Sequence, residues 1–329
     1  MRVLYIGGTG EISLACVRQS VQLGLEVTVF NRGMHNECLP DGVTRIVGDM
    51  SDSEAYARLG EEYFDVVCQF LAYDPLTAQH DLEVFGGKCG QYVLISSTAA
   101  YKKPPDRYVI TEDVLLENPF WPYAQAKAEM EDLLLQAHGD GRLAVTVVRP
   151  AHTFRAKFPG GVAQGDDWAW RVMHDRPIIV HGDGTSLWTL TYAGDFAAAF
   201  CGLLGNEKAL GEAFHITRHM EAFTWNEIWT ELAASLGRQA RLVHVPSETL
   251  VRYNADWRGQ LLGDKIYSTM FDNTKVMSVV GKFECDVSLT QGMSFASEHV
   301  KKRLASYQPD EKLHALLDRI ADEQLKLGQ

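Results

Sequence analysis

Short apolar runs alternate with longer segments of helical periodicity over the first 150 residues. Runs of strand length end near residues 6, 30, 47, 70, 96 and 148, and most of the segments between them carry apolar residues at helical spacing. Two parallel strands need a connection that runs back over one face of the sheet, and that connection is usually a helix. The pattern therefore predicts an α/β fold with a doubly wound parallel sheet and helices on both of its faces.

The pattern changes after residue 150. Residues 158–161 are typical of a loop, and a tryptophan-rich helix is expected over about 166–174. Strands are expected at 178–180, 187–191 and 213–216, with a helix from about Asp195 to residue 204. Thr224 and Glu227 form a capping box for a helix that ends at Gly237. A last amphipathic helix over 309–327 is expected to pack on its own domain.

Composition narrows the class of protein. With 329 residues, 46% of them hydrophobic, the chain can bury a large core in one big domain or two unequal ones. Six cysteines occur without a C-x-x-C pair, and no H-E-x-x-H occurs, so neither a disulfide framework nor a metal site is expected. No signal-like segment precedes the first strand, and no apolar run approaches ~18 residues, so we expect a cytoplasmic protein without membrane contact.

A glycine-rich turn follows the first apolar run. Residues 3–6 have the length of a strand, and the sequence GGTGEIS over 7–13 leads into a helical stretch. Gly7 would allow a tight turn, and Gly10 would let the backbone approach a pyrophosphate. The N-terminus of the following helix would then face that anion with free N–H groups. We therefore interpret the turn as a dinucleotide-binding turn.

Tyr123 and Lys127 form the second candidate motif. Residues four apart share one face of a helix, so the ammonium of Lys127 can lie near the phenol of Tyr123. A free tyrosine has a pKa of about 10, and acid–base work near neutrality favours a value roughly three units lower. A nearby cation in a partly dry cleft lowers a phenol pKa in this way.

Together with further motifs in order, these residues resemble the short-chain dehydrogenase/reductase superfamily, in its extended or atypical branch, the NAD(P)-dependent epimerase/dehydratase family. The added motifs are Gly48-Asp49, Phe70-Leu71-Ala72, Ser96 to Tyr101, and Arg149-Pro150. The resemblance implies a Rossmann-type sheet over 1–150 and a smaller C-terminal substrate lobe over 151–329. It also implies that segments near 178–217 return to the Rossmann domain.

The resemblance implies a Tyr/Lys/Ser mechanism. Tyr123 would transfer the proton, Lys127 would bind the cofactor ribose, and Ser97 would hydrogen-bond the reacting oxygen. The implied activity is NAD(P)-dependent oxidoreduction or epimerisation at a carbinol or carbonyl carbon of a sugar, sugar nucleotide or similar polyol. Dehydration is less expected, because residues 98–100 carry no carboxylate for an additional acid–base pair.

The second strand bears on cofactor choice. An acidic residue commonly ends this strand and selects NAD, whereas Asn31 and Arg32 stand here. A guanidinium can bind a 2′-phosphate, so NADP is favoured and NAD remains possible. Ser13 replaces the family's third glycine. The expected cofactor-binding residues are Gly7, Thr9, Gly10, Glu11, Ile12, Asn31, Arg32, Asp49, Met50, Phe70, Leu71, Ala72, Ser96, Tyr123, Lys127, Pro150 and His152.

Substrate contacts are expected from Thr98, His152, Arg155 and Trp188. His152 and Arg155 could bind an anionic or hydroxylated ligand, or His152 could be satisfied beside the nicotinamide and Arg155 solvated. Nucleotide-sugar members often carry an arginine for the diphosphate where Trp188 stands. A tryptophan cannot neutralise a diphosphate, so another cation compensates or the substrate lacks that group.

A non-catalytic alternative stays open. Some relatives of this fold bind RNA, and a cofactor-binding regulator or RNA-binding protein would keep the same sheet. The intact Ser97, Tyr123 and Lys127 argue against it, and the net charge of −12 disfavours nucleic acid. We therefore expect a small-molecule substrate and no nucleic-acid partner. The resemblance implies a possible homodimer through the helix that bears Tyr123 and Lys127.

Overall fold

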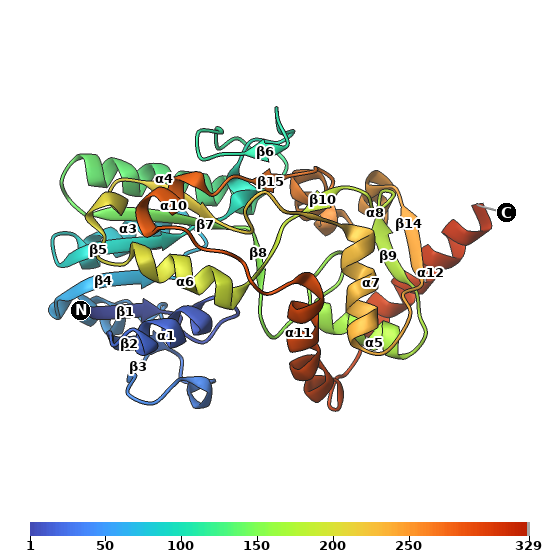
Figure 1. Ribbon diagram of the computed structural model, residues 1–329, viewed down its shortest axis with the longest axis horizontal. Helices are drawn as coiled ribbons and strands as arrows, with labels where there is room; N and C mark the ends of the chain where they lie inside the picture. Colours follow the sequence, from blue (N-terminus) through green and yellow to red (C-terminus); the bar gives the residue numbers. More distant parts are fainter. Residues whose placement is uncertain (328–329) are drawn as a thin grey trace.

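Parallel strands form one central sheet in the computed structural model, which describes residues 1–327 (Figure 1). The seven strands lie in the order β12-β7-β5-β4-β1-β2-β3, so the chain starts inside the sheet, winds to one edge at β3, and then returns through β4 to the other edge at β12. Every neighbouring pair in this sheet is parallel. The strands are β1 (Arg2–Ile6), β2 (Glu26–Asn31), β3 (Thr44–Val47), β4 (Phe64–Gln69), β5 (Cys89–Ile95), β7 (Val145–Pro150) and β12 (Ala213–Ile216). The predicted doubly wound α/β fold is confirmed.

Helices cover both faces of this sheet because successive strand residues point to opposite sides. Val3 and Tyr5 pack in the core beneath α1 (Ser13–Gln22), α6 (Ala193–Leu203) and α10 (Thr274–Val280). Leu4 and Ile6 belong to the core on the other face. The helices there are α2 (Ser53–Ala57), α3 (Pro75–Phe85) and α4 (Pro122–Gly139).

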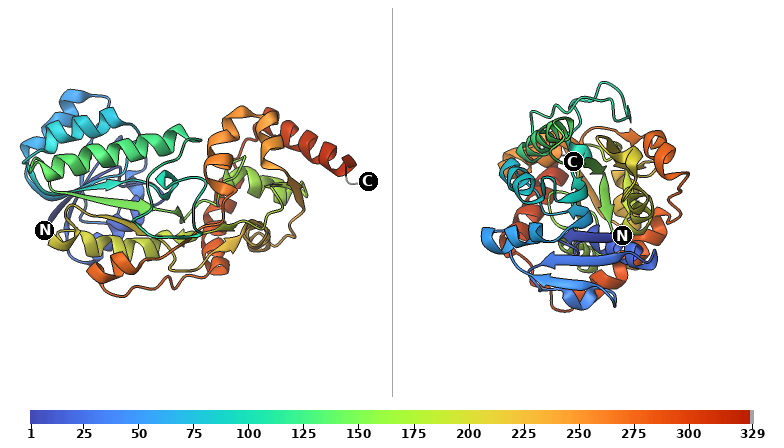
Figure 2. Two further views of the ribbon diagram at one scale, coloured as in Figure 1. Left: turned by 90° about the horizontal axis from the view of Figure 1, so that it is seen from above. Right: turned by 90° about the vertical axis from the view of Figure 1, so that its left-hand side faces the viewer.

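A second lobe lies beyond the carboxyl ends of the central strands, as both Figure 1 and the left view of Figure 2 show. Its core contains Trp168, Trp225 and Trp229, all of them fully buried. Its helices are α5 (Gly165–Met173), α7 (Trp225–Ser235), α8 (Ser247–Tyr253), α9 (Arg258–Gln260), α11 (Leu289–Leu304) and α12 (Glu311–Leu327). A π-helical segment, η6 (Leu261–Lys265), follows α9.

The remaining strands form short pairs rather than extending the central sheet. The pairs are β9 (Ile178–His181) with β14 (Leu242–Val245), β10 (Leu187–Trp188) with β13 (Phe223–Thr224), β11 (Leu190–Tyr192) with β8 (His152–Phe154), and β15 (Met270–Phe271) with β6 (Val109–Ile110). Within the range 178–217, therefore, α6 and β12 pack in or against the central sheet, whereas β9 belongs to the lobe.

The later helices match their sequence signals. Thr224 caps α7 in a capping box with Glu227. Leu317 and Ile320 of α12 are buried in the lobe core, so this helix packs on its own domain as predicted. In the part of the chain that is described, no helix combines the length and apolar character needed to cross a membrane.

Candidate active site

The glycine turn has the geometry of an anion-binding turn. Gly7 has φ +87°, and a Cβ there would lie 2.5 Å from Leu71, so only glycine fits. A Cβ on Gly8 would lie 2.7 Å from Val29, which allows α1 to pack closely on β2. Ile12 precedes α1 without a side-chain cap, which leaves that N-terminus available to a ligand. Ser13, in place of the family's third glycine, is buried and accepts a hydrogen bond from the Gly10 N–H at 2.9 Å.

Glu11 ties this turn to the chain that enters the lobe. Its Oε2 accepts hydrogen bonds from the backbone N–H groups of residues 155, 156 and 157 at 2.8–3.1 Å. The Arg155 guanidinium lies 3.7 Å from Oε1 of the same carboxylate. Thr9 and Ile12 remain partly exposed beside it. The structure thus places Arg155 against the glycine turn, away from the other expected substrate residues.

Asn31 leaves a hydrogen-bond donor without a partner where β2 ends. Its Oδ1 accepts from Gly33 N at 2.7 Å, whereas its buried Nδ2 has no partner. Arg32, the next residue, is exposed to solvent. Hydrogen bonds from the Ser51 amide and hydroxyl lower the pKa of Asp49, and Arg32 adds to this effect. An unpaired buried donor, a tight glycine turn and an uncapped helix start together fit an adenine nucleotide.

Ser97, Tyr123 and Lys127 meet at the carboxyl edge of β5. The ammonium of Lys127 is buried and donates to the carbonyls of Ala72 at 2.6 Å and Ile95 at 2.8 Å. It lies 5.7 Å from the ring centre of Tyr123 and 5.1 Å from that of Tyr73. Pro122 at the start of α4 fixes the first turn, which carries Tyr123, and Lys127 follows one turn later on the same face.

Burial is the main influence on the pKa values of Tyr123 and Lys127. Burial raises the pKa of Tyr123 to about 12, and a hydrogen bond with the Ser97 side chain opposes that rise. Burial lowers the pKa of Lys127 to about 8, although Glu131 favours its charged form. The lowered phenol pKa expected from Lys127 is therefore absent here, because the ammonium is engaged by backbone carbonyls and the phenol lies in a dry environment.

The other expected cofactor residues lie around the same strand ends. Leu71 is exposed beside Gly7, and Phe70 stacks on Tyr5 with ring centres 5.9 Å apart. Met50 is partly buried behind β2, and Pro150 ends β7 beside β12. Ser96 differs, because its hydroxyl donates to the buried carboxylate of Glu131. Its side chain is therefore bonded within the core beneath the site and is not available to a cofactor.

A cavity of about 250 Å³ opens next to Tyr123. Five of the expected residues line it: Ser97, Thr98, Tyr123, His152 and Trp188. Its other walls are Ala99, Lys103, Trp121, Ala151, Thr189, Asp264, Lys265, Thr269 and Phe271. The cavity is thus shared by the Rossmann domain and the lobe.

His152 is neutral in this cavity. Burial lowers its pKa to about 3, and the positive charge of Lys265 acts in the same direction. Its ring lies 6.5 Å from that of Trp188, which is buried in the lobe. A neutral imidazole exchanges hydrogen bonds with a ligand but brings no positive charge to it.

Sequence reasoning missed the charged side of the cavity. Lys103, Asp264 and Lys265 belong to no recognised motif, and Lys103 and Lys265 are far apart in the sequence. The one local signal was the Gly-Asp-Lys sequence ending at Lys265, which has no specific meaning by itself. Among residues 1–327, no group of three or more His, Cys, Asp or Glu side chains is arranged to hold a metal ion.

Comparison with known proteins places these features in context. The family model described as NAD dependent epimerase/dehydratase matches residues 3–217. The chain is 30% identical over 252 residues to 2'-dehydrokanamycin reductase of Streptomyces kanamyceticus, a match that covers 75% of this chain and 70% of that protein. It is 29% identical over 232 residues to the chloroplast stem-loop binding protein of 41 kDa b of Arabidopsis thaliana, covering 66% of this chain and 58% of that protein.

The fold is shared with solved structures at low sequence identity. The crystal structure of Thermus thermophilus UDP-glucose 4-epimerase in complex with NAD superposes with a TM-score of 0.73 at 23% identity. The superposition covers 92% of this chain and 99% of that chain. At this identity the likeness concerns the fold alone.

Proposed function

Because this chain belongs to the NAD-dependent epimerase/dehydratase family, we propose that it is an NAD(P)-dependent oxidoreductase or epimerase acting at a carbinol or carbonyl carbon of a sugar or similar polyol. One observation carries the proposal: Ser97 and Tyr123 line the same cavity, and Lys127 lies next to the Tyr123 ring. The glycine turn that fits a pyrophosphate lies at the same edge of the sheet.

Each residue has a distinct role in the proposed reaction. Bound nicotinamide nucleotide supplies the hydride donor or acceptor. The N-terminus of α1 and the turn at Gly7 would hold the pyrophosphate, and Lys127 would hold a ribose hydroxyl. Tyr123 gives a proton to the reacting oxygen or takes it away, and Ser97 donates a hydrogen bond to that oxygen. Trp121 and Trp188 limit the access of water to it.

We favour net reduction or oxidation over epimerisation. This preference is supported by the relative at 30% identity, which is named a reductase. An epimerase would keep its nucleotide bound and return the hydride to the same substrate, whereas a reductase exchanges nucleotide in every cycle. Nucleotide retained through purification would therefore contradict this preference and support epimerisation.

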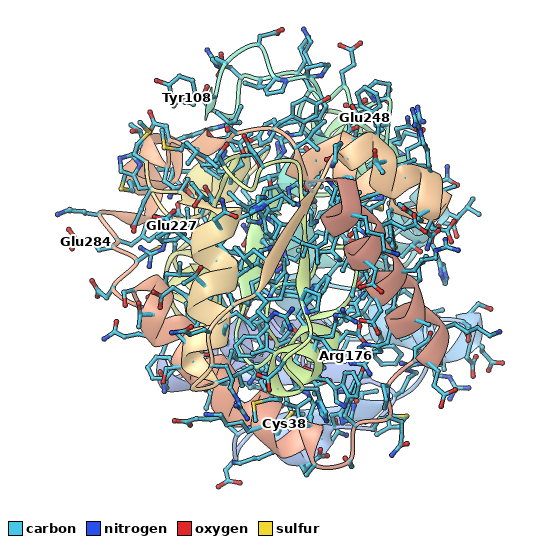
Figure 3. The ribbon with its side chains drawn as sticks, turned by 90° about the vertical axis from the view of Figure 1, so that its right-hand side faces the viewer. Cys38, Tyr108, Arg176, Glu227, Glu248 and Glu284 are labelled. Carbon is cyan, nitrogen blue, oxygen red and sulfur yellow. The ribbon has the colours of Figure 1, made fainter. Side chains whose placement is uncertain are left out.

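The first experiment measures nucleotide binding and single-turnover chemistry in Tyr123→Phe. We expect NADPH affinity to change by less than about twofold, while turnover falls by roughly 100-fold or more, because proton transfer contributes about 10²–10⁴-fold to such rates. Tyr108→Phe is the matched control. Tyr108 is an exposed phenol at the periphery of the molecule (Figure 3) and lines no part of the cavity. The proposal would be refuted if Tyr123→Phe kept full activity, or if the wild type bound neither NADPH nor NADH.

A second candidate function is RNA binding without catalysis. It is favoured by the similarity to a protein named as a chloroplast stem-loop binding protein. The net charge of −12 opposes it, because RNA affinity depends on neutralised phosphates. Retention of a stem-loop RNA that persists at moderate salt, and that Tyr123→Phe leaves unchanged, would support this alternative.

A further inference from the structure

Three charged residues line the cavity that contains Tyr123 and Ser97, and the two lysines among them are buried. Lys103 comes from the loop after β5, and Asp264 and Lys265 end the π-helical segment η6. Lys103 and Lys265 are only 5% and 6% exposed. Lys103 Nζ lies 3.8 Å from Asp264 Oδ1. Two ammonium groups and one carboxylate leave this cluster with one positive charge when all are ionised.

The backbone of this cluster is held firmly. The buried side-chain amide of Asn118 donates to the Ala99 carbonyl at 2.8 Å and to the Gly263 carbonyl at 2.7 Å. It thereby joins the loop beside Ser97 to η6. The Lys265 carbonyl lies 3.1 Å from His181 Nε2. Short π-helical segments occur frequently at functional sites, and here the segment places two charged residues in succession on one cavity.

The two ammonium groups have unmet hydrogen-bonding capacity. Neither Lys103 Nζ nor Lys265 Nζ makes a hydrogen bond within residues 1–327. Lys265 Nζ lies 5.2 Å from the ring centre of Trp188, and Lys103 Nζ lies 5.8 Å from that of Tyr267. An ammonium has three donors, and neither Nζ is among the fully buried polar atoms that lack a partner, so both are accessible from the cavity. Burial lowers the pKa of both lysines, while Asp264 favours their charged forms. A ligand oxyanion would supply the missing acceptors.

The remaining walls define the size of the ligand. At about 250 Å³ the cavity lies just below the usual range for ligand pockets, ~300–1,000 Å³, and suits one ring. Trp121, Trp188 and Phe271 offer flat apolar surface, and the Thr189 and Thr269 side chains add polar groups. Aromatic faces combined with hydroxyls and charges match a polyhydroxylated ring, which has apolar C–H faces and a polar rim.

We propose that Lys103 and Lys265 bind the oxyanion of a single-ring polyol substrate, a sugar carboxylate or a sugar phosphate, while Asp264 accepts a hydrogen bond from one of its hydroxyls. The inference rests on the proposed function, because it assigns the substrate class of the same cavity. It places the acidic group at η6 and the reacting carbon beside Tyr123.

Two other substrate classes fit this cavity poorly. An amine-rich ligand would place its ammonium groups against Lys103 and Lys265, with only Asp264 to offset the repulsion. A nucleoside diphosphate is larger than a one-ring cavity of about 250 Å³.

The test compares acidic and neutral probes on the full chain by calorimetric titration, with saturating NADPH and again without nucleotide. The probes are D-glucuronate, D-glucose 6-phosphate and D-glucose. We expect at least one acidic probe to bind about tenfold more tightly than glucose, and the tighter acid identifies the oxyanion. Lys265→Met and Lys103→Met should remove this preference, and Lys265→Arg should keep most of it. Lys88→Met removes an equal charge from an exposed site and should change nothing.

The inference is overturned if glucose binds as tightly as both acids, or if neither acid binds. Retention of the acid preference in both Lys103→Met and Lys265→Met would also overturn it. If a methionine variant fails to fold, Asp264→Asn replaces it, and this variant should keep or strengthen the acid preference. Failure of the wild type to bind nucleotide would refute the proposed function alone. The ratio of the affinities for acidic and neutral probes is also measured without nucleotide, so it would still test this inference.

Discussion

Lys127 is a buried ammonium whose hydrogen bonds go to uncharged acceptors. It donates to two backbone carbonyls, and burial lowers its pKa to about 8 from 10.5. Between these two values the unfolded chain holds a proton that the folded chain has released. The free energy of unfolding therefore rises as the pH increases from 8 to 10.5, and below pH 8 the burial of the charge is a constant destabilising contribution.

Removing that ammonium should flatten this part of the pH dependence. The difference between 10.5 and about 8 corresponds to a free energy on the order of 3 kcal/mol. We expect Lys127→Met, compared with wild type, to lose that rise in unfolding free energy between pH 8 and 10.5. Urea denaturation at several pH values measures it. Parallel pH profiles for the two proteins would show that Lys127 does not titrate in this range.

The NADP preference expected from the sequence depends on Arg32. It follows the uncharged Asn31 and has no fixed hydrogen-bonding partner in residues 1–327. Charge-assisted hydrogen bonds contribute about 1.5–3 kcal/mol, so Arg32→Ala should weaken NADPH binding by roughly 10- to 100-fold. NADH binding should change by about twofold or less. Arg238→Ala, at an exposed site of the lobe, is the control for loss of charge. Equal losses for both nucleotides would contradict a 2′-phosphate contact.

At the scale of elements, a buried ion pair joins α4 to the central sheet. Arg149 of β7 lies 2.6 Å from Glu131 of α4, and both are almost completely buried. Ser96 donates to the same carboxylate, and Tyr101 accepts from Arg149 at 3.1 Å. This network fixes the helix that carries Tyr123 relative to the strand ends that form the site.

Breaking this pair should be strongly destabilising. Glu131→Gln leaves the Arg149 guanidinium buried without its counter-charge, which typically reduces stability by about 3–5 kcal/mol. We expect a clear fall in the urea midpoint, and the double variant Glu131→Leu/Arg149→Met should recover much of it. Glu129→Gln, on the exposed face of the same helix, should stay within about 0.5 kcal/mol of wild type. Equal effects of Glu131→Gln and Glu129→Gln would contradict a structural role for the pair.

The sequence predicted elements better than it predicted their partners. The apolar runs located the ends of the first six central strands within about two residues, because buried parallel strands are almost continuously apolar. Periodicity does not encode which strands pair. The segment at 178–180 therefore became β9, paired with β14 in the lobe, although its composition resembles that of a central strand. In the same way, motif order located Ser97 and Tyr123, whereas tertiary packing alone brought Lys103 to Lys265.

At the scale of the whole molecule, the homodimer expected through α4 stays a prediction. The solvent-exposed side of this helix carries Gln125, Glu129, Asp132 and Gln136. A twofold axis beside α4 would bring acidic residues of the two copies close together, and added salt screens such repulsion. We therefore expect the dimer fraction in sedimentation velocity to increase with ionic strength. A monomer at every salt concentration, or a dimer that salt dissociates, would contradict this arrangement.

The contact between Glu11 and residues 155–157 has a kinetic consequence. The Glu11 carboxylate, in the glycine turn, accepts hydrogen bonds from the three residues that follow β8. A nucleotide bound at the glycine turn would lie against the chain that leads on from His152, a residue of the cavity wall. We therefore expect the nucleotide to bind first and the substrate second. Product-inhibition patterns would show this compulsory order of binding.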